Sequence, residues 1–73
     1  VVYVYDNEPR NDQITSRIER HIKAGDRVVI WPHGIKEKDI NDMILNGHPV
    51  QQIVNDNTYS GLKATLKLND WRK

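Results

Sequence analysis

The sequence predicts an α/β fold, in which a parallel strand–helix–strand unit is followed by two or three short helices. Two runs of β-branched and aromatic residues, near 1–6 and 26–31, flank a segment with helical periodicity at 11–24. This order and spacing favour parallel strands joined by a right-handed crossover. A chain of 73 residues accommodates one small domain.

The first predicted strand, Val1-Val2-Tyr3-Val4-Tyr5, runs directly into an acidic turn that contains Asp6 and Glu8, followed by Pro9 and Arg10. Ligands of open α/β sheets gather beyond the carboxyl ends of the strands. Both acids are therefore expected at a functional edge. Arg10 beside them is predicted either to contact phosphate or to pair with Glu8.

The helix predicted over 11–24 has Asn11 or Asp12 as its N-cap and Gly25 as a left-handed stop. Its apolar face consists of residues four apart, which are Ile14, Ile18 and Ile22. The second strand follows, so residues after Tyr5 and residues after Trp31 should meet at one edge of the sheet.

Two short helices are predicted next. Asp39 occupies an N-cap position, with Asp42 placed as in a capping box, and Gly47 closes this helix. Pro49 is predicted at the first position of the second helix, which ends at residues 55–57.

The last segment, residues 60–73, fits two patterns. Leu62 and Leu66 are four apart, as in a helix capped by Ser60, whereas the apolar residues of 62–68 also alternate as in a strand. We favour the helix, with Trp71 packing its end.

Composition excludes several classes of function. The net charge of +1 predicts no general affinity for nucleic acid or membranes, and the absence of cysteine excludes disulfides and cysteine-bound zinc. No apolar run approaches the length of a membrane span. The chain starts inside a strand without an initiator methionine, which indicates a fragment of a larger protein.

The two acidic clusters have two interpretations. Hard oxygen ligands on short loops suit Mg²⁺, so Asp6, Glu8 and Asp39 are candidate ligands. Alternatively, Asp39 is a simple helix cap, Asp42 favours the helix dipole, and the first cluster is a solvated turn. Residue types alone leave both readings open.

The order of these motifs resembles the second half of a Toprim domain. Asp-Asn-Glu-Pro-Arg (6–10), Lys-Asp-Ile-Asn-Asp-Met (38–43) and the closing Gly61-Leu62-Lys63-Ala64 segment are similar to the C-terminal end of DNA primases of T-even-type bacteriophages. The resemblance covers nearly all of the chain. It implies a partial, Rossmann-like Toprim domain over residues 1–73, without the upstream glutamate strand and zinc-binding module of that family.

The resemblance also implies roles for individual residues. Asp6 matches the first acid of the family's Asp-x-Asp motif, Glu8 stands in place of the second acid, and Asp39 matches a third. These three would be catalytic and would bind Mg²⁺ or Mn²⁺, weakly in this fragment. Phosphate-binding residues would be Arg10 and Lys38, and Asn41 and Asp42 are possible further site residues.

The activity implied for the parent protein is the synthesis of short RNA primers by nucleotidyl transfer. Its partners would be a single-stranded DNA template, ribonucleoside triphosphates and a replicative helicase, in the cytoplasm of a bacterial host. This fragment alone is expected to be inactive. Alternatives are another Toprim activity, such as a nuclease or topoisomerase, or a non-catalytic phage domain. The exposed edge of the first strand predicts self-association or cover by the C-terminal segment.

Overall fold

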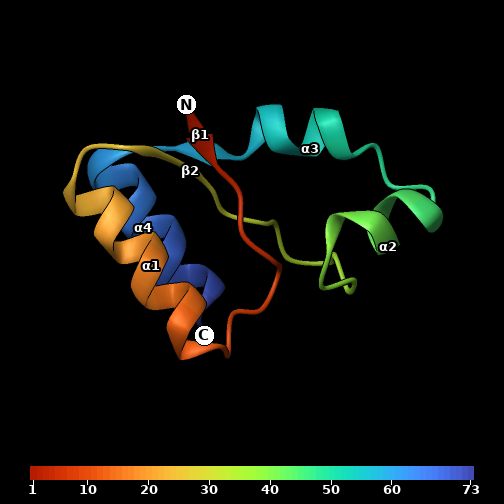
Figure 1. The fold of residues 1–73 in the computed structure, drawn as a ribbon, viewed down its shortest axis with the longest axis horizontal. Helices are drawn as coiled ribbons and strands as arrows, with labels where there is room; N and C mark the ends of the chain where they lie inside the picture. Colours follow the sequence, from red (N-terminus) through yellow and green to blue (C-terminus); the bar gives the residue numbers. More distant parts are fainter.

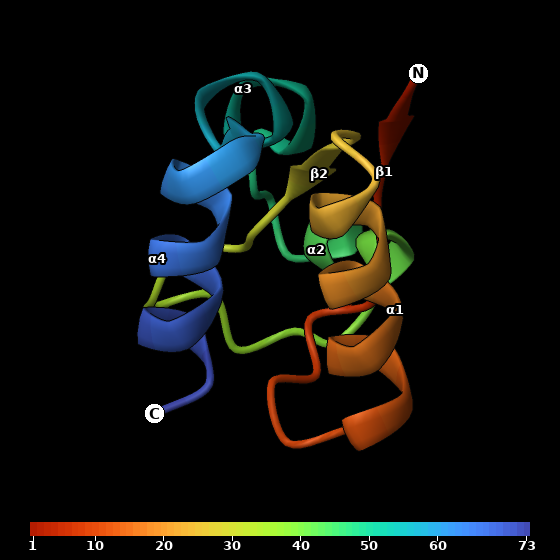
Figure 2. The same ribbon diagram turned by 90° about the vertical axis from the view of Figure 1, so that its left-hand side faces the viewer.

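Three short strands form one sheet in the order β1-β2-β3, and four helices surround it. Figure 1 shows this arrangement in the computed structural model, which describes residues 1–73. The elements along the chain are β1 (Val2–Tyr3), α1 (Asp12–Lys23), β2 (Arg27–Val29), α2 (Ile40–Leu45), α3 (Val50–Asp56), β3 (Thr58–Tyr59) and α4 (Gly61–Trp71). The helices α1 and α4 lie side by side in Figure 2, and α2 and α3 lie at the other end of the molecule in Figure 1.

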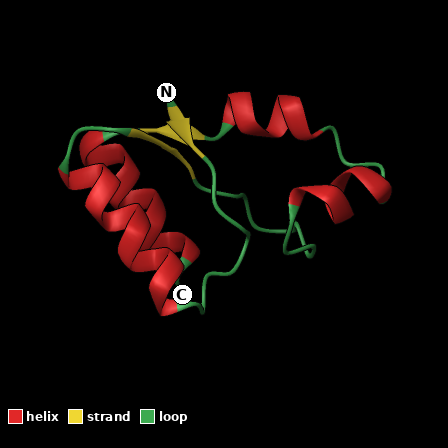
Figure 3. Ribbon diagram, in the orientation of Figure 1, coloured by secondary structure: helices red, strands yellow, loops and turns green.

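The sheet confirms the predicted α/β class and the parallel strand–helix–strand unit. β1 pairs with β2 in parallel, with Val2 opposite Arg27 and Tyr3 opposite Val28. β3 was not predicted. It pairs with β2 in the antiparallel direction, on the side of β2 away from β1. Figure 3 shows the strands in yellow, where they gather at one place between the helices.

Both predicted strands are shorter than the apolar runs that predicted them, 1–6 and 26–31. The backbone groups beyond the regular ladder find other partners. The Tyr5 carbonyl accepts a hydrogen bond from the Trp31 indole N–H at 2.8 Å. The Ile30 N–H donates to the Asn57 carbonyl at 3.0 Å. The β1–β2 ladder thus ends before Tyr5, while the Ile30–Asn57 bond continues the register of β2 and β3 by one residue pair.

Helix α1 follows the prediction closely. The Asn11 side chain caps its first turn by accepting from the N–H groups of Gln13 and Ile14. Ile18 is fully buried, whereas Ile14 and Ile22 are half-buried against the core. Gly25, just beyond the helix, has φ of 84°, a conformation that favours glycine.

The two short helices also form. Asp39 caps α2, its carboxylate accepting from the Asp42 N–H at 2.8 Å. Pro49 lies one residue earlier than predicted, as the N-cap residue of α3. Met43 is the fully buried residue of α2 and connects this end of the molecule to the core.

The C-terminal segment is the favoured helix, but its predicted apolar pair faces the wrong way. Leu62 and Leu66 are 76% and 60% exposed, while the buried residues of α4 are Ala64, Leu68 and Trp71. The contact with α1 and the sheet selects this face. Trp71 packs the end of the helix as predicted.

The edge of β1 has no strand partner within the chain. β3 lies beyond β2, and α4 packs against α1, so the C-terminal segment pairs elsewhere. Self-association through this edge therefore remains a prediction. No helix in the chain has the length and apolar character needed to cross a bilayer.

The two neighbouring residues Met43 and Ile44 provide a test of the α2 packing. Met43 is 0% exposed and Ile44 is 59% exposed. Met43→Ala should lower the free energy of unfolding by about 2–5 kcal/mol, because it leaves a cavity in the core. Ile44→Ala, the matched control, should change it by less than about 0.5 kcal/mol. Urea unfolding followed by tryptophan fluorescence measures both, and equal losses would contradict the observed helix orientation.

Candidate functional site

Asn7 joins the two loops that leave the carboxyl ends of β1 and β2. Its backbone N–H donates to the Lys38 carbonyl at 2.6 Å. Its side-chain amide donates to the carbonyls of Ile35 and Glu37 at 2.9 and 3.1 Å. The acidic turn is therefore held along residues 35–38, as the parallel topology predicted for residues that follow the two strands.

Two buried tryptophans hold the same turn by hydrogen bonds from the core side. The Trp71 indole N–H donates to the side-chain oxygen of Asn7 at 3.0 Å, and the Trp31 indole donates to the Tyr5 carbonyl. Both indoles lie in the core, at 5% and 2% exposure. The end of α4 thus supports a loop that precedes it by more than sixty positions, and every polar atom of the Asn7 amide has a partner.

A cleft of about 480 Å³ lies between the two loops. It is lined by residues from 7–11 and 32–38 together with Trp71, and it is rich in positive charge. The charged lining residues are Glu8, Arg10, Lys36 and Lys38. Sequence analysis proposed three of these four as site residues, and the structure brings those three, Glu8, Arg10 and Lys38, to one cleft.

The cations of the cleft are not neutralised by acids of the chain. No carboxylate lies within ion-pair distance of Arg10, Lys36 or Lys38. The alternative of an Arg10–Glu8 salt bridge is therefore absent from the structure. His33 also borders the cleft, but its Nε2 lies 2.9 Å from the Asp70 carboxylate. Three free cations around one hollow favour an anionic ligand.

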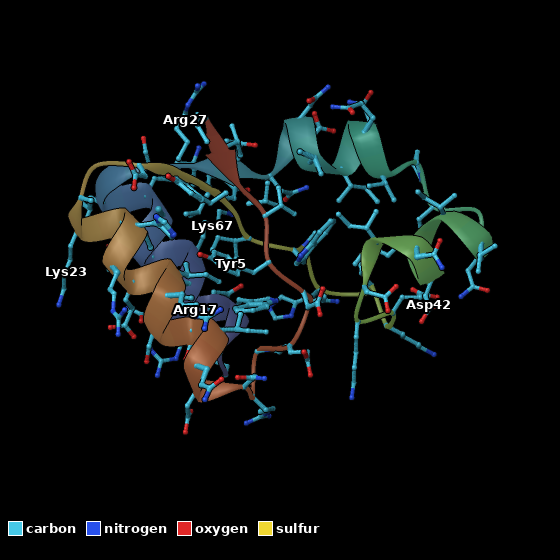
Figure 4. All side chains as sticks on the ribbon, viewed as in Figure 1. Tyr5, Arg17, Lys23, Arg27, Asp42 and Lys67 are labelled. Carbon is cyan, nitrogen blue, oxygen red and sulfur yellow. The ribbon has the colours of Figure 1, made fainter.

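The remaining proposed site residues lie outside the cleft lining. Asp6 is exposed at the turn, and Asp39 is half-buried with one carboxylate oxygen engaged in capping α2. Asn41 and Asp42 are exposed in the first turn of α2. In Figure 4, Asp42 lies on α2, at the end of the molecule opposite α1.

The carboxylates suit Mg²⁺ or Mn²⁺ by their chemistry, because both cations bind oxygen ligands. The positions of these carboxylates do not form a complete metal site within the chain. No group of three or more His, Asp or Glu side chains is gathered closely enough to hold a metal ion. Magnesium often uses one or two carboxylates and takes its other ligands from water and substrate phosphates. Metal binding by Asp6, Glu8 and Asp39 therefore stays a prediction.

Sequence analysis missed a second polar cluster next to Asn7, centred on Glu37. Its carboxylate lies 2.8 Å from the Nε2 atom of His48 and accepts from the Asn46 amide at 2.9 Å. A hydrogen bond from its own backbone amide, followed by those from His48 and Asn46, holds the pKa of Glu37 below its ordinary value of 4.5. This cluster ties the loop before α2 to the turn after it.

Comparison with known proteins identifies one relevant similarity. The chain is 34% identical to the DNA primase of Enterobacteria phage T4 over 77 aligned positions, which include 99% of this chain and 22% of the primase. The chain thus spans about a fifth of the length of the curated relative it matches. No protein-family model matches the chain.

Replacing Asn7 tests the connection between the two loops. Asn7→Ala leaves two carbonyls and the Trp71 indole without their partner, so the free energy of unfolding should fall by about 1–3 kcal/mol. Trp71 emission should shift as its indole N–H loses the Asn7 acceptor. Asn69→Ala is the control, because Asn69 is exposed on α4 and its side chain forms no hydrogen bond within the chain. Urea unfolding measures the difference, and similar values for both variants would contradict the connecting role.

The lowered pKa of Glu37 predicts a dependence of stability on pH. A carboxyl group whose pKa is lower in the folded state contributes stability above its unfolded pKa, near 4.5. That contribution should decline as the pH falls through the lowered folded-state pKa. The difference in unfolding free energy between the wild type and Glu37→Gln should therefore be constant near neutral pH and shrink below pH 4.5. A difference that stays constant through the acid range would refute this assignment.

Proposed function

We propose that this chain is part of a phage DNA primase, which synthesises short RNA primers for DNA replication by metal-dependent nucleotidyl transfer. One observation carries the proposal. A cleft with three unpaired cations and a carboxylate lies at the carboxyl ends of two parallel strands. The proposal is supported by similarity to the T4 primase along almost the whole chain. Within this proposal, residues 1–73 are the C-terminal half of a Toprim domain.

The cleft cations provide sites for the phosphates of a ribonucleoside triphosphate. Arg10 comes from the loop after β1, and Lys36 and Lys38 come from the loop after β2, so cations face the hollow from two directions. The Lys38 carbonyl is held by Asn7, which fixes the backbone while the ammonium group remains free. A guanidinium group binds phosphate through two parallel hydrogen bonds, whereas an ammonium group acts as a point charge.

We assign Asp6, Glu8 and Asp39 as the acids that bind Mg²⁺ or Mn²⁺ weakly, together with substrate phosphates. When bound, such an ion neutralises triphosphate charge and activates an attacking hydroxyl group. Glu8 reaches the cleft directly. Asp39 retains one carboxylate oxygen that is not used in capping α2. Asn41 and Asp42 lie close to Asp39 in sequence and assist it from α2.

The parent protein would use a single-stranded DNA template and ribonucleoside triphosphates, and would act beside a replicative helicase in the cytoplasm of the bacterial host. This chain covers only about a fifth of the T4 relative. We therefore expect that the 73-residue chain alone makes no primers. Precise positioning of reacting groups depends on the whole site, and displacement by about 1 Å can reduce the rate a hundredfold.

Substitutions in the longer protein test these assignments. Asp6→Asn and Asp39→Asn should abolish primer synthesis, since each removes a charged oxygen ligand. Asparagine caps a helix as well as aspartate does, so the fold should survive in Asp39→Asn. Asp42→Asn should reduce activity less, because Asp42 lies further along the first turn of α2, where its charge favours the helix dipole. A primer-synthesis assay with labelled ribonucleotides measures these effects.

Thermal melts of each variant provide the control for folding. Full activity of Asp39→Asn, or primers made by the isolated 73-residue chain, would contradict the assignment. If a variant lost its cooperative thermal transition as well as its activity, the loss would be due to unfolding. That result would also count against a direct role of the carboxylate.

A further inference from the structure

A row of three cations lies on the exposed face of α1, away from the cleft. Arg17, Arg20 and Lys23 are three residues apart, all exposed, and none forms an ion pair. Residues at this spacing are neighbours on a helix surface. Figure 4 shows Arg17 and Lys23 on α1, with Lys23 projecting outward. We call these three residues the α1 basic row.

The acids closest to this row in sequence are directed elsewhere. Glu19 lies four residues before Lys23, a favourable arrangement for a helical ion pair, yet its carboxylate binds Arg72 of α4 at 2.7 Å. The Asp26 carboxylate lies 3.0 Å from the Nδ1 atom of His21. Asp12, at the start of α1, borders the same depression as Arg17 and Arg20 but forms no ion pair with either. Three cations against this single acid leave the row with net positive charge, although the composition of the chain is nearly balanced.

Charge is also separated along the molecule. Between Lys38 and Lys63 the sequence contains no lysine or arginine, while Asp39, Asp42 and Asp56 fall in this stretch. These acids belong to the α2–α3 end, opposite α1 in Figure 1. An anionic partner would therefore be attracted to the α1 side and repelled from the other end.

We infer that the α1 basic row binds the phosphate backbone of single-stranded nucleic acid, at a surface distinct from the cleft. The choice of nucleic acid as ligand rests on the proposed function. Arg17 and Lys23 are six positions apart, which is about 9 Å along the helix axis, so the three cations can contact successive phosphates of one strand. The depression beside Arg17 and Arg20, of about 390 Å³, has only polar and charged lining, completed by Asp12, Gln13 and Ser16.

The side chains around the α1 basic row favour nucleic acid over a membrane surface as its ligand. Helices that bind in the plane of a membrane place large apolar side chains on the face opposite their cations and insert them into the bilayer. On α1 that opposite face, formed by Ile14, Ile18 and Ile22, is packed into the core. Only polar groups remain to contact a ligand, which suits phosphates and not acyl chains.

Binding of a fluorescein-labelled oligodeoxythymidylate to the 73-residue chain, followed by fluorescence anisotropy at increasing salt, tests this inference. The variant Arg17→Gln/Arg20→Gln/Lys23→Gln should bind about tenfold more weakly at low salt. The slope of log affinity against log salt should fall by about 2, since each lost phosphate contact removes roughly 0.7 for a single strand. Glutamine is a good helix former, and circular dichroism checks that α1 persists.

Two variants with the same change in charge serve as controls. Arg27→Gln/Lys63→Gln/Lys67→Gln removes three cations that form no ion pair. Lys63 and Lys67 lie over the Tyr59 ring, so circular dichroism checks the fold of this variant too. It should retain the wild-type slope. Equal losses in this control would overturn the inference by showing an effect of net charge. Arg10→Gln/Lys36→Gln/Lys38→Gln should weaken binding of a ribonucleoside triphosphate to the cleft while leaving oligonucleotide binding by the row largely intact.

The remaining outcomes also decide the question. Loss of oligonucleotide binding only in the cleft variant would overturn the α1 site and leave the proposed function standing. Oligonucleotide binding that depends on the row, without triphosphate binding, would support the α1 site and count against the proposed function. No binding by the wild type, or stronger binding to phosphatidylserine vesicles than to the oligonucleotide, would overturn the inference.

Discussion

The hydrogen bonds of Asn7 are the interaction on which the arrangement of both loops depends. One residue connects the turn after β1, the segment before α2 and the end of α4. Such a set is effective because a buried carbonyl or indole N–H without a partner is costly. Neighbouring side chains that project from the turn, such as Glu8 and Arg10, are thereby presented to the cleft. The architecture of the candidate site thus follows from a neutral residue placed between two acids.

A small core makes such polar connections more important. Nine apolar residues are buried, and one of them, Met43, comes from α2. Domains of this size bury a modest fraction of their surface, so loops have little apolar packing of their own. Two polar contacts, between Asn7 and Trp71 and between Glu37 and His48, therefore hold the loops in positions that apolar packing alone does not fix. No buried side-chain polar atom lacks a hydrogen-bond partner.

The net charge of the chain does not describe the charge of its individual surfaces. A value of +1 predicted no general attraction for polyanions. In the folded chain, however, the ion pair between Glu19 and Arg72 and the contact between Asp26 and His21 withdraw acids from the surface of α1. Six of the cations without an ion pair lie on α1 and around the cleft, and Arg27, Lys63 and Lys67 lie elsewhere. Local fields depend on which charges are paired, and pairing is a property of the tertiary structure.

The sequence by itself determined the elements whose signals are local. Isoleucines four apart and the Asn11 cap predicted α1, the β-branched runs predicted the parallel strands, and Asp39 predicted the start of α2. The acidic turn identified Glu8 and Arg10, and the resemblance to phage primases added Lys38; the structure brings these three to one cleft, whereas convergence of the three metal-site acids stays a proposal.

Only the tertiary structure decided the features that depend on distant partners. The two-residue strand β3 exists because β2 offers a free edge, and a pair of residues is too short to produce a periodic signal. Spacing predicted a helix for Leu62 and Leu66, but contact with α1 turned these leucines outward and buried Ala64 and Leu68 instead. The role of Asn7 requires Ile35, Glu37, Lys38 and Trp71, which are adjacent only after folding. Local periodicity specifies secondary structure, whereas the choice of buried face and polar partner depends on the packing of the whole chain.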